Sequence, residues 1–337
     1  MIKSVQYLRG IAAVLVVLFH ASSALMTHFT LGSKNYFSWG EAGVDLFFII
    51  SGFIMVYITY NKNISFKNFF LKRVIRIYPV FWVYASIALL IFLINPNMIN
   101  RSTAMPTLIL PSYLLIPYTE FTNLVQVAWT LVYEVHFYLL FGLSLFFANR
   151  YRYIAAGFML SLVAALSVFN FDIYYLKFVT NPIILEFLLG MIIYFIIFKK
   201  NTKDLIFLSI LFILSMLTLS LNEQPAERVI KYGVPSFIFM LVILYLDSIK
   251  MLGSGRDIFS KFLTALGDSS YSLYLSHIFC IGVGVIVLNK LQLINGSTAQ
   301  FLIFILTIGS IIWGYISFKF IETPLINKLN SIVFKKK

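Results

Sequence analysis

The sequence is poor in charge, in cysteine and in nucleotide-binding motifs. Charged residues make up 12% of its 337 residues, whereas a soluble domain has about 25%. Cys280 is the single cysteine, which excludes an intramolecular disulfide, a CxxC redox motif and a thiolate zinc cluster. The chain also has no Walker loop, no GxGxxG and no HExxH. With so little polar surface, it is not an ordinary soluble protein.

What the sequence has in abundance is long apolar segments. Hydrophobic residues make up 60% of the chain, and the mean hydropathy is +0.91. A membrane-spanning helix needs about 20 mainly apolar residues. The apolar windows predict ten such helices, near residues 5–25, 40–60, 76–94, 127–148, 153–170, 182–198, 204–221, 233–247, 267–289 and 299–320. The predicted fold class is therefore all-α and polytopic, with nine or eleven spans as alternatives because the 233–247 window is short.

The basic residues predict the orientation of these spans. If the N-terminus lies inside, the inner segments hold 20 Lys and Arg residues and the outer segments hold 6. This is a strong positive-inside bias, and an odd number of spans would destroy it. We therefore predict that the N-terminus and the C-terminus are both cytoplasmic. The basic rim would face an anionic leaflet, so the net charge of +13 does not call for a nucleic-acid partner.

No part of the sequence predicts a soluble domain. The longest stretch outside the spans runs from about residue 95 to 126 and contains four prolines. No internal repeat is apparent, which disfavours transporter folds built from two repeats. The prediction is a single membrane domain over residues 1–337.

The first apolar segment, YLRGIAAVLVVLFHASSA, has an arginine near one end and a histidine near the other. Arg9 and His20 share one face of a helix, roughly 16 Å apart along its axis. A signal peptide is the alternative, because Lys3 and Arg9 would form its basic region and residues 22–24 a cleavage site. Cleavage would discard His20, so a functional role for His20 favours a retained span.

Four ionisable residues fall within predicted spans: His20, Asp45, Glu134 and Glu186. Their positions place all four roughly 6–10 Å below the outer surface. Such residues are costly to bury in a membrane and are usually functional. One imidazole beside carboxylates is typical of a general base whose ring is oriented by an acid. One histidine with three acids is a poor zinc set, so we predict no metal.

A second feature lies on the inner side, in FKNFFLKRVIRIYPVFW. Arg73 and Arg76 occupy neighbouring positions on one helical face, and arginine side chains suit phosphate. The alternative is an ordinary basic flank whose side chains snorkel to the interface. An inner phosphate anchor that includes Arg9 and an outer base at His20 would suit a long substrate threaded between them.

Seven segments in order resemble the membrane-bound acyltransferase family 3. They are YLRGIAAVLVVLFHA, GVDLFFIISGFIMVY, FFLKRVIRIYPVFW, WTLVYEVHFYLLF, LEFLLGMIIYF, LGDSSYSLYLSHIF and FKFIETPL. The ISGFIMVY and WTLVYE forms are most similar to its exopolysaccharide-production O-acetyltransferase branch. Each segment alone is mostly apolar and weak, whereas seven in order over residues 7–325 are specific.

The resemblance implies a multi-pass enzyme of the bacterial inner membrane. Such enzymes are thought to move an acyl group from cytoplasmic acyl-CoA, here acetyl-CoA in the first place, to a hydroxyl of an extracytoplasmic or lipid-linked glycan. No permanently bound cofactor is implied, and other polysaccharide-biosynthesis proteins are conceivable partners. Some members carry a C-terminal SGNH esterase-like domain. We expect none here, so that transfer is complete in one step or a separate partner finishes it.

The resemblance also implies roles for single residues. His20 matches the essential histidine of the family, which would deprotonate the acceptor hydroxyl while Asp45 or Glu134 holds the ring. Glu186 matches the acid of LEFLLG less closely. Direct transfer and a transient acyl-histidine both remain open.

The family arginines, expected near the CoA phosphates, correspond to Arg9, Arg73 and Arg76. Gln6 departs from the pattern, because many members have Asp there, and this leaves Arg9 without a local counter-ion in the sequence. His136 also departs, and it lies about 200° round the helix from Glu134, so we interpret it as structural.

Three more residues are candidates for lining the site. Ser51 is either a nucleophile or a residue that bonds its own backbone and eases a bend. His277 either lines the channel or hydrogen-bonds a neighbouring helix. Trp129, like Tyr138, is predicted to be an interfacial or packing aromatic rather than a sugar platform.

Two other classes of function compete with an enzyme. One is an exporter of polysaccharide or lipid-linked sugar, with the buried charges as a proton relay. The other is a receptor or assembly subunit without chemistry. The arginine pair at an inner mouth favours acyl-CoA over a proton path.

Overall fold

The computed structural model describes residues 2–26, 35–99, 107–118, 123–198, 201–222, 226–251, 257–295 and 298–334. These residues form helices and turns, with no strand among them. The chain folds into two compact units. Unit 1 comprises Met1–Phe47 and Leu246–Lys328, and unit 2 comprises Phe48–Tyr245 and Leu329–Lys337. The predicted single membrane domain stays a prediction, and each unit is described by itself.

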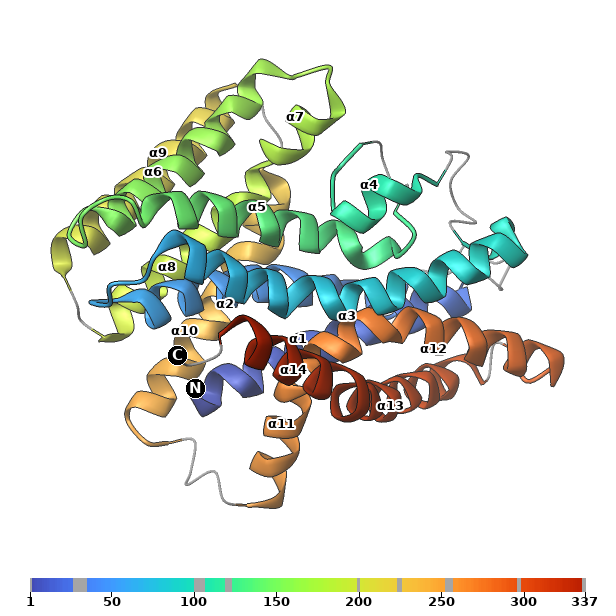
Figure 1. Cartoon of the computed structure of the whole chain (residues 1–337). Helices are drawn as coiled ribbons and strands as arrows, with labels where there is room; N and C mark the ends of the chain where they lie inside the picture. Colours follow the sequence, from blue (N-terminus) through green and yellow to red (C-terminus); the bar gives the residue numbers. More distant parts are fainter. Residues whose placement is uncertain are drawn as a thin grey trace. The chain divides into compact units, whose positions relative to one another are not determined.

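Unit 1 is built from the two ends of the chain. Its elements are α1 (Lys3–Met26), η1 (Ser38–Glu41), α11 (Ile258–Asp268), α12 (Ser270–Lys290), α13 (Ala299–Ser317) and η7 (Phe318–Glu322). The helices α12 and α13 run side by side, as the orange and red ribbons of Figure 1 show. Three helices begin in one unit and end in the other, namely α2 (Ala42–Thr59), α10 (Val234–Ser248) and α14 (Thr323–Val333).

A stripe of apolar residues on α1 forms the core of unit 1. Ala13, Val17, Ala21 and Leu25 recur every fourth residue, so they lie on one helical face. They are fully buried against apolar side chains of α12 and α13. His20 precedes Ala21 in the chain and is half-buried.

Unit 2 contains the middle of the chain. Its elements are α3 (Phe66–Ile94), η2 (Pro96–Met98), α4 (Ile109–Leu114), η3 (Gln126–Ala128), α5 (Trp129–Ser144), α6 (Arg152–Ala165), η4 (Leu166–Phe169), α7 (Tyr174–Val179), η5 (Pro182–Ile184), α8 (Leu185–Phe198), α9 (Thr202–Leu221) and η6 (Val229–Gly233). The helices α6 and α9 run side by side (Figure 1).

Glycine lets two helices of unit 2 touch through their backbones. A Cβ atom added to Gly52 of α2 would lie 2.0 Å from the Phe187 carbonyl oxygen of α8. One added to Gly190 of α8 would lie 1.9 Å from the Ile49 carbonyl oxygen of α2. Helices in membranes associate through such small residues, because lipid gives no hydrophobic drive for association.

Polar side chains begin several helices. Ser65 accepts a hydrogen bond from Asn68 N at the start of α3, and Asn181 accepts one from Ile183 N before Pro182. At the start of α11, Asp257 accepts hydrogen bonds from the Oγ and the backbone N of Ser260, which lower the pKa of its carboxyl. These caps satisfy backbone groups that a helix leaves without a partner.

Ten helical segments among the described residues are long and apolar enough to cross a membrane. They confirm the ten predicted spans by length and composition, and the short 233–247 window is extended by η6 to begin at Val229. Only 22% of the apolar window of Thr202–Leu221 is buried inside the structure. So much exposed apolar surface is typical of helices that face lipid, and the protein is a multi-pass membrane protein. The predicted orientation of its termini stays a prediction.

Candidate active site

The predicted site residues divide between the two units. Unit 1 contains Arg9, His20, Asp45 and His277, and unit 2 contains Ser51, Arg73, Arg76, Trp129, Glu134 and Glu186. The predicted common depth of the four ionisable residues stays a prediction. The following contacts lie within one unit each.

His20 contacts a second histidine. Its Nδ1 lies 3.1 Å from Nε2 of His277 and 3.1 Å from the carbonyl oxygen of Val16. His277 is fully buried on α12. His277 was predicted either to line the channel or to hydrogen-bond a neighbouring helix. The structure shows the hydrogen bond, which reaches His20 on α1.

The predicted acid beside His20 stays a prediction. Asp45 is fully buried in the first turn of α2, where the positive end of the helix dipole favours a negative charge. Within the described residues, the hydrogen bonds of the His20 ring go to Val16 and His277, and none goes to Asp45.

Arg9 receives polar partners that the sequence did not reveal. Its Nη1 donates to Oε1 of Gln6 at 3.1 Å, and Nε2 of Gln6 donates to Oδ1 of Asp268 at 2.5 Å. Gly267 makes this contact feasible, because a Cβ atom there would lie 2.1 Å from the Gln6 carbonyl oxygen. Gln6 therefore does not leave Arg9 isolated, since it joins Arg9 to a carboxylate at the end of α11.

Glu134 is the centre of a polar cluster in unit 2. Ser51 Oγ donates to Glu134 Oε1 at 3.0 Å, and the Tyr138 hydroxyl donates to the same oxygen. Ser51 thus bonds the carboxylate, which neither of its two predicted roles includes. Tyr138, which the sequence indicated as a packing aromatic, contributes its hydroxyl to this cluster.

Arg73 extends the cluster along α3. Its guanidinium lies 5.6 Å from the ring centroid of Tyr138 and 5.9 Å from that of Phe69. The two ring faces attract a cation. Its Nε is buried without a hydrogen-bond partner in the described part of the chain. Arg76 follows three residues later on the same helix, as predicted.

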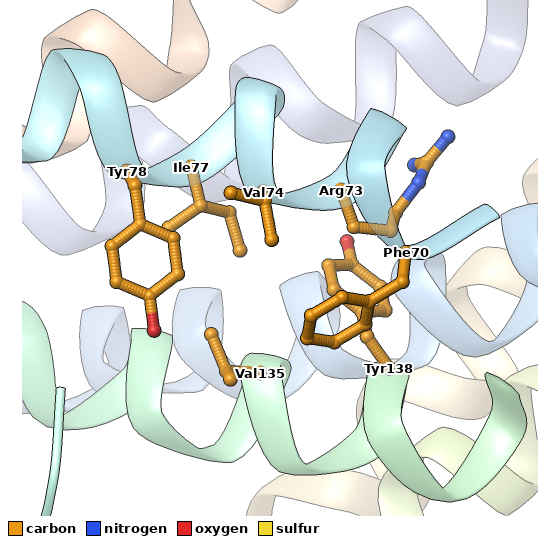
Figure 2. Close-up of a pocket in the computed structure, with 7 residues that line it drawn as sticks. All are labelled: Phe70, Arg73, Val74, Ile77, Tyr78, Val135 and Tyr138. Atoms are coloured by element: carbon orange, nitrogen blue, oxygen red, sulfur yellow. The ribbon is translucent and has the colours of Figure 1, made fainter. Parts of the chain in front are cut away.

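A small hollow lies between α3 and α5. Figure 2 shows its lining, which is Phe70, Arg73, Val74, Ile77, Tyr78, Val135 and Tyr138. The guanidinium of Arg73 points away from the apolar side chains, and the Tyr78 hydroxyl donates to the Leu114 carbonyl oxygen of α4 at 3.2 Å. The lining is therefore mostly apolar, and the Arg73 side chain lies at one end of it.

Glu186 and Trp129 lie elsewhere in unit 2. Glu186 is fully buried in the first turn of α8, and Gly233 makes room for it, since a Cβ atom there would lie 3.0 Å from Glu186 Oε1. Trp129 packs edge-to-face on Tyr133 at 5.9 Å. The guanidinium of Arg228 lies 5.7 Å from the Trp129 ring centroid. These contacts agree with a packing role for Trp129.

His136 is held by its own surroundings. Its Nδ1 lies 2.8 Å from the Val132 carbonyl oxygen and its Nε2 lies 3.2 Å from the Tyr175 hydroxyl. Both ring nitrogens of His136 therefore have hydrogen-bond partners within unit 2, as expected of a residue with a structural role. Among the described residues, no group of three or more His, Cys, Asp and Glu side chains is arranged to hold a metal ion.

Sequence reasoning missed the contacts of Tyr138 and Asp268 and the identity of the residue that His277 bonds. All three lie in two of the segments that carry the family resemblance, WTLVYEVHFYLLF and LGDSSYSLYLSHIF. The spacing of Glu134 and Tyr138, four residues on a helix, was a usable signal because such residues share a face. No sequence signal joins Asp268 or His277 to α1, because they lie 262 and 257 residues from the α1 residues that they bond.

Comparison with known proteins shows which family the chain resembles. The family model described as "Acyltransferase domain" matches residues 2–318. The chain is 32% identical to the "Exopolysaccharide production protein ExoZ" of Rhizobium meliloti (strain 1021) over 321 residues, which are 93% of this chain and 95% of that protein. It is 24% identical to the "O-acetyltransferase OatA" of Staphylococcus aureus (strain NCTC 8325 / PS 47) over 359 residues, covering 95% of this chain and 56% of that protein.

No solved structure matches the chain significantly. The family model nevertheless covers far more than half of the sequence, and the first relative is similar over nearly its full length. The chain therefore belongs to this acyltransferase family, on the side of its exopolysaccharide branch, and is a membrane O-acyltransferase.

Proposed function

We propose that this enzyme transfers an acetyl group from acetyl-CoA to a hydroxyl of an extracytoplasmic or lipid-linked polysaccharide. The observation that carries the proposal is the chain of contacts from Arg73 through Tyr138 to Glu134. It joins a cation that suits phosphate to a carboxylate that suits proton transfer. The proposed setting is a bacterial inner membrane, with both termini in the cytoplasm.

Arg73 supports a donor that carries phosphate. A guanidinium presents its N–H groups in a planar fork that matches phosphate oxygens. The aromatic faces of Phe69 and Tyr138 hold this cation without neutralising it. Arg76 and Arg9 are proposed as further phosphate ligands, and the small apolar hollow between α3 and α5 lies beside Arg73 (Figure 2).

The reaction needs one base and one leaving group. His20 takes the proton from the acceptor hydroxyl, and the hydroxyl oxygen attacks the thioester carbonyl. The carbon–sulfur bond then breaks, the new ester forms, and the thiolate of CoA takes up a proton. Glu134 and Asp45 are proposed to supply negative charge around this exchange, which favours the protonated imidazole.

The names of the relatives support the acceptor class. One is an exopolysaccharide production protein and the other an O-acetyltransferase. An exporter of polysaccharide would need no acyl donor, so the assay itself separates the two functions. Membranes that contain the protein are given acetyl-CoA labelled in the acetyl group, together with the polysaccharide of the producing cell. Labelled polysaccharide supports the transferase, and its absence across several acyl donors favours the exporter.

Removing the arginine pair should weaken donor binding. The double substitution of Arg73→Ala with Arg76→Ala is expected to raise the KM for acetyl-CoA by about tenfold or more, since a charge-assisted hydrogen bond contributes about 1.5–3 kcal/mol. Initial rates at varied acetyl-CoA concentration measure this change. Arg150→Ala is the matched control, because Arg150 is an exposed arginine of the same unit that stacks on Tyr151. An unchanged KM in the double variant would exclude these arginines as phosphate ligands.

Neutralising Glu134 should slow the transfer and leave the cluster in place. Glu134→Gln keeps a side-chain oxygen that can accept from Ser51 and Tyr138, but it removes the charge. We expect kcat to fall by about 5–30-fold, because hydrogen bonds to a charged group are stronger by about 1–2 kcal/mol than those between neutral groups. Ser51→Ala serves as the comparison: if Ser51 were a nucleophile, its loss would abolish the reaction instead of reducing it. Full kcat in Glu134→Gln would show that the charge plays no part.

A further inference from the structure

Two imidazole rings meet inside unit 1. His20 comes from α1 and His277 from α12, and their ring centroids lie 5.0 Å apart. The contact joins Nδ1 of His20 to Nε2 of His277 at 3.1 Å. Both helices belong to the apolar core of the unit, so the pair is held by packing on both sides.

Backbone carbonyls determine which nitrogen of each ring carries the hydrogen. Nδ1 of His277 lies 3.2 Å from the Leu273 carbonyl oxygen, and Nδ1 of His20 lies 3.1 Å from the Val16 carbonyl oxygen. A carbonyl oxygen only accepts hydrogen bonds, so each Nδ1 carries a hydrogen. In a neutral imidazole the other nitrogen then has a lone pair. His277 Nε2 is therefore the acceptor, and His20 Nδ1–H donates to it and to Val16.

The reverse arrangement does not satisfy these contacts. If Nε2 of His277 donated, Nδ1 of His20 would have to accept, and its lone pair would face the Val16 oxygen at 3.1 Å. Two lone pairs at that distance repel. The arrangement with His20 as donor satisfies the hydrogen bonds to both carbonyls and the bond between the rings.

We propose that His277 is a positioning residue that holds His20 as the Nδ1–H tautomer. This inference rests on the proposed function, because it assigns the base within that reaction. With Nδ1 engaged, Nε2 of His20 is the nitrogen that takes the proton from the acceptor hydroxyl. When it does so, the lone pair of His277 faces the N–H of the new imidazolium and stabilises it, as a carboxylate does in a Ser-His-Asp triad.

A neutral imidazole suits this position in a membrane protein. A carboxylate at the same place would be a second buried charge, which is costly where water is scarce. A histidine accepts the same hydrogen bond and carries no charge in the resting state. His277 therefore gives the His20 ring a hydrogen-bond partner that is neutral at rest.

Nitrogen NMR on the full-length protein in lipid bilayers tests the tautomer directly. The chain has only four histidines, so spectra of ¹⁵N-histidine-labelled protein can be assigned with His20→Gln and His277→Gln. We expect both rings to be protonated at Nδ1, with a through-hydrogen-bond correlation between His20 Nδ1 and His277 Nε2. A His20 ring protonated at Nε2 alone would overturn the proposal.

Kinetics test what the contact does. His277→Leu removes the acceptor, and we expect kcat to fall by about 10–100-fold, the range found when a partner that orients a functional histidine is lost. The KM for acetyl-CoA should stay unchanged, because His277 is not proposed to touch the donor. His277→Gln should recover part of kcat, since its amide oxygen can accept from His20 Nδ1–H.

The controls separate this inference from the proposed function. His136→Leu removes a histidine that makes a similar pair of hydrogen bonds outside unit 1, and it should keep the wild-type kcat. Equal kcat in His277→Leu and the wild type would overturn the positioning role while the transferase stands. If the wild type transfers no acetyl group, the proposed function fails, and the NMR correlation still reports whether the histidines pair.

Discussion

Replacing His20 with alanine is expected to lower the rate of acyl transfer by about 10²–10⁴-fold, the contribution of a general base. The Nδ1 atom of His20 is engaged by Val16 and His277, which leaves Nε2 as the nitrogen for proton transfer. The substitution removes the group that accepts the proton from the acceptor hydroxyl. The measurement is transfer of label from acetyl-CoA to polysaccharide, using membranes with equal amounts of each protein.

The matched control for this experiment is His136→Ala. His136 is also half-buried in a spanning helix, and it hydrogen-bonds a backbone carbonyl four residues earlier and the Tyr175 hydroxyl. We expect its substitution to leave the transfer rate within about threefold of the wild type, because a group that serves only packing alters stability more than chemistry. If His20→Ala and wild-type membranes label the polysaccharide equally, His20 is not the base.

Replacing Gly190 with leucine is expected to prevent unit 2 from folding around Glu134 and Ser51. Even a single added carbon would lie 1.9 Å from the Ile49 carbonyl oxygen, 2.8 Å from its carbonyl carbon and 2.8 Å from Phe53 N. These are backbone atoms of α2, so no side-chain rotation relieves the clash. Overpacking costs about 1–3 kcal/mol, and occasionally more, where side chains can shift. We expect a larger loss here.

The amount of folded protein can be followed by size-exclusion chromatography of detergent extracts during heating. Gly190→Leu should give little monodisperse protein, and Gly190→Ala should melt at a clearly lower temperature than the wild type. Gly282→Ala is the control, because an added Cβ atom there meets no described atom within 4 Å. A wild-type melting curve for Gly190→Ala would show that α2 and α8 do not approach each other as described.

The sequence predicted the spans well because a bilayer imposes a simple rule. Each crossing needs about 20 apolar residues, and that property depends on composition and length alone. The ten predicted windows therefore correspond to the ten long apolar helices among the described residues, with differences at their ends. The third helix begins at Phe66, well before the window at 76, because Ser65 caps it and its first turns are polar. An apolar window does not include helical turns that contain charged and polar residues.

The site was predicted less completely, for a different physical reason. Ionisable residues within apolar segments are visible in the sequence, since their cost in a membrane makes them rare. Which groups touch each other depends on helix packing, and the partners come from far along the chain. His20 meets His277 across 257 residues, and Gln6 joins Arg9 to an aspartate 262 residues away from Gln6. These contacts give Arg9 and His20 polar partners that the sequence did not predict.

The amino-acid order alone was enough to predict an all-helical membrane protein that belongs to an acyltransferase family. These properties follow from composition, from the 3.6-residue period of the helix and from a set of motifs in order. The packing of the helices was needed to show that Tyr138 and Ser51 share one oxygen of Glu134, and that His277 accepts from His20. The reason is that small residues, such as the glycines on α2, α8 and α11, set how closely two helices approach, and that distance decides which polar groups can bond.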